Sequence, residues 1–79
     1  MTINVHTFAA AKELLGSPIS VIVHKGATVA ELRAAILEQY VELGELKDFA
    51  IARNEAYARP EDPITASDNL VIIPPVSGG

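Results

Sequence analysis

Residues 28–40, TVAELRAAILEQY, constrain the fold more strongly than any other part of this chain. Thr28 stands three residues before Glu31, the spacing of a capping box, in which each side chain hydrogen-bonds the backbone N–H of the other residue. Four apolar side chains then recur at three- and four-residue intervals: Val29, Leu32, Ile36 and Tyr40. This period predicts an amphipathic helix from about Val29 to Tyr40, whose apolar stripe must pack against another layer of the domain.

The segments on both sides of this helix have the patterns of strands. Four short strands are predicted from alternating or apolar residues, at 3–8, 19–24, 49–53 and 56–58. Residues 70–73, LVII, form a continuous apolar run, which we interpret as a strand buried on both faces. Good helix formers over residues 9–15, followed by Gly16, predict a short helix or turn between the first two strands.

Two turn signals separate the later strands, at Asn54-Glu55 and at Ser67-Asp68-Asn69. The first two strands can pair as a hairpin, and the helix can then cross over to a later strand. For a chain of 79 residues, one helix packed on a mixed sheet is the simplest solution. We therefore predict an α+β fold of the β-grasp (ubiquitin-like) type, with four to five strands and one main helix. The length allows one domain, placed at residues 1–75, followed by a flexible tail at residues 76–79.

The composition excludes several kinds of function. The chain has no cysteine, which excludes disulfides, thiolate metal sites and cysteine nucleophiles. His6 and His24 each lie opposite the better apolar face of a predicted strand, with no carboxylate pattern nearby, so we predict no metal site. A net charge of −4 speaks against nucleic-acid binding and agrees with steering towards a basic cleft on a protein, or simply with solubility. The N-terminus lacks signal-peptide features and no stretch approaches the ~20 apolar residues of a membrane span, so we expect a soluble, cytoplasmic protein.

The final six residues, Pro74-Pro75-Val76-Ser77-Gly78-Gly79, carry the most functional information. Two prolines cannot donate ladder hydrogen bonds and hold φ at about −65°, so they end the last strand and set its direction of exit. Glycine has no side chain, so the tip of such a tail can approach a partner's active site through a narrow channel. Once activated, for instance as an acyl-adenylate, the carboxylate of Gly79 becomes an acyl donor that a sulfur nucleophile can convert to a thiocarboxylate. The competing interpretation is a frayed end or a cloning remnant.

These residues resemble the small subunits of molybdopterin synthase. Residues 74–79 are similar to the terminal Pro-Pro-Val-x-Gly-Gly signature of that family. Shorter matches to its motifs lie at Phe8-Ala9, at Lys12-Glu13-Leu14 before Gly16, at Thr28-Val29 and Leu32, and at Arg53-Asn54. The resemblance covers nearly the whole chain. It departs in the loop before the last strand, where relatives often have Asp-Gly-Asp-Glu and this chain has Ala66-Ser67-Asp68-Asn69.

The resemblance implies a sulfur carrier with no active site of its own. An ATP-dependent adenylating enzyme would activate the Gly79 carboxylate, and a sulfurtransferase would convert it to a thiocarboxylate. The tail would then enter the large catalytic subunit of the synthase, in a heterotetramer, and donate sulfur to a cyclic pyranopterin phosphate during molybdenum cofactor biosynthesis. No bound cofactor is expected, only the covalent thiocarboxylate at Gly79 and its acyl-adenylate precursor. The residues expected to contact the large subunit are Phe8, Ile73, Pro75, Val76, Ser77 and Gly78.

Three other functions stay open at this point. A thiamine-pathway sulfur carrier would share the fold and the Gly-Gly end, but less often the Pro-Pro-Val approach. A ubiquitin-like modifier would be joined through Gly79 to lysines of target proteins. A plain interaction domain would make no use of the two terminal glycines.

Overall fold

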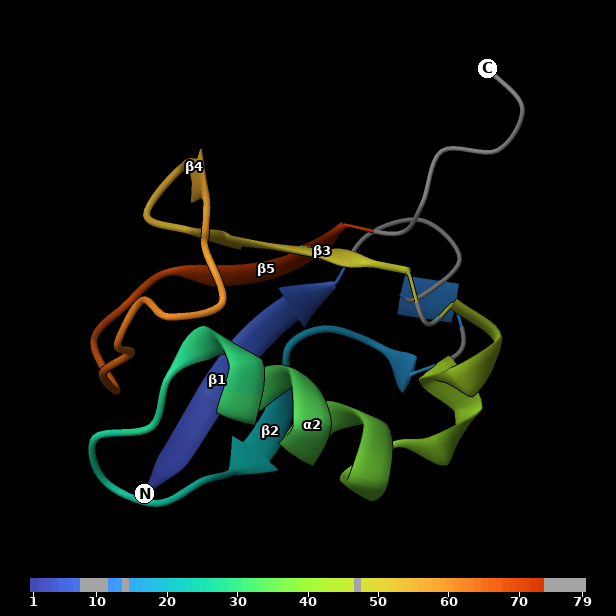
Figure 1. Ribbon diagram of the computed structural model, residues 1–79. Helices are drawn as coiled ribbons and strands as arrows, with labels where there is room; N and C mark the ends of the chain where they lie inside the picture. Colours follow the sequence, from blue (N-terminus) through green and yellow to red (C-terminus); the bar gives the residue numbers. More distant parts are fainter. Residues whose placement is uncertain (8–11, 14, 47, 74–79) are drawn as a thin grey trace.

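The computed structural model describes residues 1–7, 12–13, 15–46 and 48–73. The elements in chain order are β1 (Thr2–Thr7), β2 (Ile19–Ile22), α2 (Val29–Gln39), the 3₁₀ helix η1 (Val41–Leu46), β3 (Ala50–Arg53), β4 (Ala56–Tyr57) and β5 (Leu70–Ile73). The strands form one five-stranded sheet in the order β2-β1-β5-β3-β4, with α2 packed across one face (Figure 1). The predicted β-grasp architecture, a mixed sheet with one main helix, is confirmed.

The first and last strands lie side by side in the middle of the sheet. β1 pairs antiparallel with β2 and parallel with β5, while β3 pairs antiparallel with both β5 and β4. A parallel pair cannot be joined by a tight turn, so the chain between β1 and β5 must cross over. The crossover contains α2, which is why the helix covers the sheet and both β1 and β5 become central.

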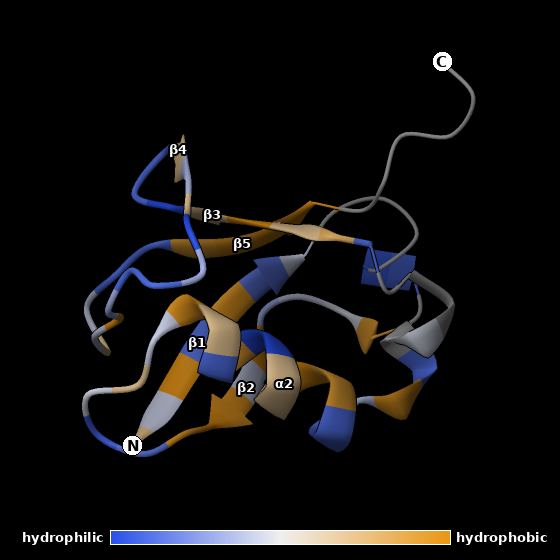
Figure 2. Ribbon diagram, in the orientation of Figure 1, coloured by the Kyte–Doolittle hydropathy of each residue, from blue (hydrophilic) through white to orange (hydrophobic). Residues whose placement is uncertain are grey.

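The core lies between α2 and the inner face of the sheet (Figure 2). Its buried apolar side chains alternate along the strands and recur along the helix: Ile3, Val5, Ile19, Val21, Ile51, Leu70 and Ile72 from the sheet, and Val29, Leu32 and Ile36 from α2. The prediction that β5 is buried on both faces was wrong. Leu70 and Ile72 are buried, but Val71 and Ile73 are only half-buried, because helix α2 covers only one face of the sheet.

Helix α2 begins as the sequence predicts. Glu31 donates its backbone N–H to Thr28 Oγ1 over 3.3 Å, and Thr28 donates its backbone N–H to Glu31 Oε1 over 3.0 Å. The capping box is therefore complete and satisfies two backbone donors that a helix start leaves unpaired. The helix ends at Gln39 with Tyr40 as its C-cap.

Two turns of the sheet are held by local backbone conformation and by the side chain of Asp68. Asn54 and Glu55 both have positive φ, 53° and 71°, as a two-residue hairpin turn requires. Asp68 closes the loop that lacks the usual glycine, accepting hydrogen bonds from the Thr65 backbone N–H, from Arg53 Nε and from Asn54 Nδ2. Burial disfavours the charged form of Asp68, but these three bonds outweigh it, so the pKa of this carboxyl is lowered.

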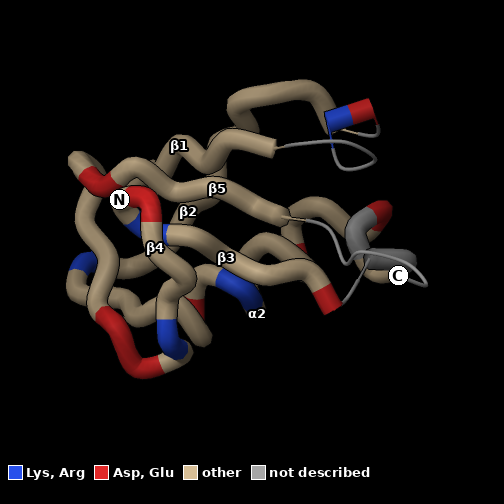
Figure 3. The backbone as a smooth tube through the Cα atoms, turned by 90° about the horizontal axis from the view of Figure 1, so that it is seen from above, with Lys and Arg blue, Asp and Glu red and all other residues tan. Residues whose placement is uncertain are grey.

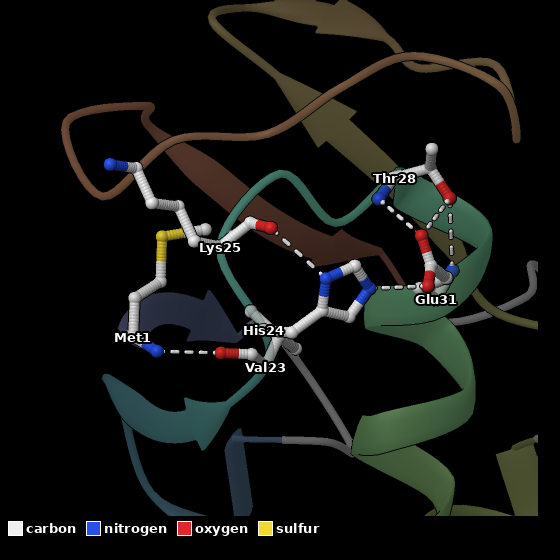
Figure 4. Close-up of polar contacts among 6 residues, drawn as sticks. All are labelled: Met1, Val23, His24, Lys25, Thr28 and Glu31. Carbon is white, nitrogen blue, oxygen red and sulfur yellow. Dashed lines mark hydrogen bonds and ion pairs between the residues drawn. The ribbon is translucent and has the colours of Figure 1, made fainter.

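We expected no carboxylate pattern near His24 from the sequence, but the structure shows an ion pair there. His24, just after β2, places Nε2 2.5 Å from Glu31 Oε2 and Nδ1 3.0 Å from the Lys25 carbonyl oxygen (Figure 4). Both neighbours are acceptors, so both ring nitrogens are satisfied only when both carry a proton. The hydrogen bond to Glu31, and then that to Lys25, raise the pKa of His24, while His24 lowers the pKa of Glu31.

The pair makes a testable prediction about pH. By NMR titration we expect the pKa of His24 to lie above its ordinary 6.5 and to fall back towards that value in Glu31→Gln. Glutamine can still serve in the capping box, so the helix start is kept. Since the pKa is raised in the folded state, the stabilisation from the pair is present below the unfolded pKa and is lost as pH rises through the folded one.

The matched control for this titration is Glu38→Gln, which removes an exposed carboxylate from the same helix. It should leave the His24 titration unchanged. An unchanged His24 pKa in Glu31→Gln would contradict the assignment.

Candidate functional site

Three strand ends meet at the point from which the C-terminal residues continue. The parallel register pairs Thr7, the last residue of β1, with Ile72, and the antiparallel register pairs Ala50, the first residue of β3, with Ile73. Ile73 at the end of β5 therefore lies between β1 and β3. Parallel strands end at the same edge of a sheet, so the chain continues into residues 8 and 74 from one edge.

This edge is anchored by buried polar contacts of Thr7. The side chain is 2% exposed; its Oγ1 donates to the Gly16 carbonyl oxygen over 2.5 Å, and its backbone N–H donates to Ser17 Oγ over 3.0 Å. Gly16 has a φ of 81°, the left-handed conformation typical after a helix end. These contacts hold the returning chain at Gly16 and Ser17 against the end of β1, the strand that pairs with β5.

A second anchor lies under the start of β3. Phe49 is fully buried, and the guanidinium carbon of Arg33 lies 4.3 Å from the centre of its ring, within cation–π range. The Arg33 guanidinium also donates a hydrogen bond to the Phe49 carbonyl oxygen. Helix α2 is thus connected directly to the strand that borders Ile73.

The face of the sheet away from α2 carries an apolar patch beside this edge. We define the outer patch as Ala50, Ala52, Tyr57, Val71 and Ile73. The register places Val71 next to Ala52, and Ala52 next to Tyr57, whose side chain is 75% exposed. Figure 3 shows that β1, β5 and most of β3 carry no Lys, Arg, Asp or Glu, with charges at the margins. Such a surface favours contact with an apolar partner surface over electrostatic binding.

A groove of about 240 Å³ lies next to the patch. It is lined by the start of α2 and by β3, β4 and the segment after it: Val29, Ala30, Arg33, Ala50, Ile51, Tyr57, Ala58 and Pro60. Ala50 and Tyr57 belong to both the groove and the outer patch. The groove and the outer patch therefore meet at these two residues, at the edge of the sheet.

Residues 5–79 match the sequence model of the ThiS family. The match runs from the second half of β1 through the other strands and helix α2 to the C-terminal glycines. The chain belongs to the ThiS family.

Relatives of this ThiS-family chain include subunits named for molybdopterin synthesis and a protein named as a modifier. It is 33% identical to a molybdopterin synthase sulfur carrier subunit of Arabidopsis thaliana, over 98% of this chain and 82% of the relative. Among solved structures, SAMP1, the small archaeal modifier protein 1 of Haloferax volcanii, matches with a TM-score of 0.81 and 27% identity over all of both chains. A chain from the complex of subunits 1 and 2 of the molybdopterin-converting factor of Helicobacter pylori matches with a TM-score of 0.68 and 28% identity, also over all of both chains.

Of the predicted site residues of this ThiS-family chain, Ile73 is described: it is half-buried at the base of the tail and belongs to the outer patch. The others lie outside the described residues: Phe8, Pro75, Val76, Ser77, Gly78 and Gly79. Sequence reasoning missed Val71, Ala52 and Tyr57 as surface residues. The period of two in strands was the available signal, because a strand that buries Leu70 and Ile72 must turn Val71 and Ile73 to the other face.

Within the described part of the chain, no group of three His, Cys, Asp or Glu side chains is arranged to hold a metal ion. No helix among these same residues has the length and apolar character needed to span a membrane.

Proposed function

We propose that this chain is the sulfur carrier subunit of a molybdopterin synthase and that its working group is the C-terminal carboxylate of Gly79. The observation that supports this most directly is the Pro-Pro-Val-Ser-Gly-Gly end, which continues from the anchored strand β5 beside the outer patch. The match to the ThiS family, which reaches Gly79, and the similarity to the Arabidopsis carrier subunit support the same conclusion.

The chemistry follows from the acidity of the terminal carboxyl group. With a pKa of roughly 3.3–3.7 it is ionised at neutral pH and is a poor electrophile. Attack of the Gly79 carboxylate on the α-phosphate of ATP, in a separate adenylating enzyme, forms the acyl-adenylate and releases pyrophosphate. A sulfide equivalent from a sulfurtransferase then attacks the acyl carbon, the C–O bond to AMP breaks, and the thiocarboxylate remains on Gly79. In this proposal the ATP-dependent cycle runs in the cytoplasm.

In this proposal the chain supplies the sulfur, and its partner supplies the catalytic groups. The tail enters the large subunit of the synthase, which transfers the sulfur to a cyclic pyranopterin phosphate, in a heterotetramer of two small and two large subunits. The outer patch is the docking surface, since it is apolar and borders the edge from which the tail departs. The relative from Helicobacter pylori was solved as a complex of two subunits, which supports a partner of this kind.

The experiment that tests the proposed function is intact mass spectrometry of the purified chain. Incubation with an adenylating enzyme, ATP and a sulfur donor should replace one oxygen by sulfur, and fragmentation should place the change at Gly79. Omitting ATP is the control. A chain that acquires no sulfur under these conditions would contradict the carrier function.

A substitution in the outer patch tests the docking surface. In Val71→Lys we expect binding to the large subunit to weaken by about 10–100-fold, since a charge at the centre of an apolar interface costs the ~2 kcal/mol or more of a hot spot. Titration calorimetry would measure the dissociation constant. The matched control, Thr2→Lys, adds the same charge at an exposed position outside the patch and should bind normally. Equal affinities for the two variants would exclude the patch as the interface.

The similarity to the small archaeal modifier protein supports a second function, conjugation of Gly79 to lysines of other proteins. The two functions leave different products in cells. A carrier is recovered at its own mass, in part as the thiocarboxylate, whereas a modifier also forms conjugates of higher mass that resist reducing agents. A thiamine-pathway carrier would form the thiocarboxylate without a stable complex with the large subunit.

A further inference from the structure

Strand β2 forms one edge of the sheet, opposite the β3–β4 side that carries the outer patch. Its register pairs Val21 with Ile3 and Ile19 with Val5 of β1. In an antiparallel ladder, alternate residues direct their backbone groups to opposite sides of the strand. The backbone groups of Ser20 and Ile22 consequently point outwards, where a further strand would add to the sheet.

Two side chains at the end of α2 make hydrogen bonds to outward backbone groups of Ser20 and Ile22. The Ile22 backbone N–H donates to Gln39 Oε1 over 3.0 Å, and Gln39 Nε2 donates to the Ile22 carbonyl oxygen over 2.8 Å. The Tyr40 hydroxyl donates to the Ser20 carbonyl oxygen over 2.7 Å. The Gln39 amide offers one donor and one acceptor to the same residue, which is what a residue of an antiparallel partner strand offers.

The geometry points to a cap that keeps this edge from pairing with a second copy of the chain. We propose that Gln39 and Tyr40 act as this strand cap and that, without it, two copies join through β2. A two-fold antiparallel arrangement would pair Ser20 of each copy with Ile22 of the other, so the same two residues satisfy each other across the contact. The Ile22 side chain is 68% exposed beside the cap, so the edge also carries apolar surface that a second strand would cover.

The first experiment measures whether the cap protects the edge in solution. Amide hydrogen exchange of the full chain is followed by NMR for the wild type, Gln39→Ala and Glu38→Ala. We expect exchange of the Ile22 amide to become at least about tenfold faster in Gln39→Ala, since its hydrogen bond is lost. The Val21 amide faces β1 and should not change, and Glu38→Ala, an exposed neighbour on α2, should behave as the wild type. Unchanged exchange at Ile22 in Gln39→Ala would overturn the proposal.

The second experiment measures association by sedimentation velocity, up to the concentrations used for NMR. The wild type and Glu38→Ala should remain monomeric, while Gln39→Ala/Tyr40→Phe should form a dimer as its concentration rises. Adding Ile22→Pro to this variant should restore the monomer, because proline removes an outward donor and is tolerated on edge strands. If the double variant does not fold, Gln39→Ala alone is taken through the same series. A folded, uncapped variant that stays monomeric, or a dimer that persists with Ile22→Pro, would overturn the proposal.

Discussion

A chain shortened by Gly78 and Gly79 is expected to fold normally and to lose all detectable sulfur transfer. The truncation removes the proposed acyl group and shortens the tail that must reach the partner's active site. The hydrogen bonds described at the end of β1 join Thr7 to Gly16 and Ser17. The measurement is thiocarboxylate formation by mass spectrometry, together with synthesis of molybdopterin in a reconstituted system.

The control for this truncation is Ser77→Ala, which keeps the length of the tail and its terminal carboxylate. It should retain transfer, because the proposed role of Ser77 is that of a spacer. Both variants should show the thermal unfolding midpoint of the wild type. A truncated chain that still supports cofactor synthesis would remove the basis of the proposed function, whereas loss of transfer together with loss of folding would point to a structural role for the tail.

The largest loss of stability is expected for Phe49→Ala. Phe49 is fully buried and lies beneath the Arg33 guanidinium, so the substitution leaves a cavity and removes a cation–π contact. Substitutions of this kind cost about 3–5 kcal/mol. A domain of 79 residues is expected to have an unfolding free energy of about 4–12 kcal/mol, so the loss is a large part of the total. Urea unfolding would measure it.

The matched control for Phe49→Ala is Tyr57→Ala, which removes an aromatic side chain that is 75% exposed. We expect a change within about 0.5 kcal/mol, as is usual for surface positions. If both variants lost a similar amount of unfolding free energy, the burial of Phe49 would not explain its contribution to stability.

Much of the fold could be predicted because its signals are local. The capping box of Thr28 and Glu31 depends on atoms three residues apart, and the turn at Asn54-Glu55 depends on two consecutive backbone conformations. The strand run at residues 70–73 was also found, but its burial was predicted wrongly. A run of apolar residues shows that the strand is hydrophobic, but the burial of each face depends on the layers packed against it. Helix α2 covers only one face of the sheet.

The candidate site likewise has one part that the sequence predicted and one part that it did not. The composition of the tail was evident from its six residues, and with it the proposed chemistry of Gly79. The neighbours of Ile73 could not be predicted, because pairings between distant parts of the chain bring Thr7 and Ala50 beside β5. The contacts of Gln39 with Ile22, 17 residues apart, have the same origin. His24 and Glu31 are seven residues apart, and they meet because the chain turns between β2 and α2.

Local sequence thus specifies the helix, the turns, the positions of the strands along the chain and a terminal group suited to acyl chemistry. Which side chains share the outer patch, which edge of the sheet is capped and where the tail begins depend on strand register and on the packing of α2. Hydrogen bonds and steric limits between near neighbours act within a few residues, and the sequence therefore displays their effects directly. Register and layer packing join residues far apart in the chain, and their outcome appears only when the whole sheet has formed.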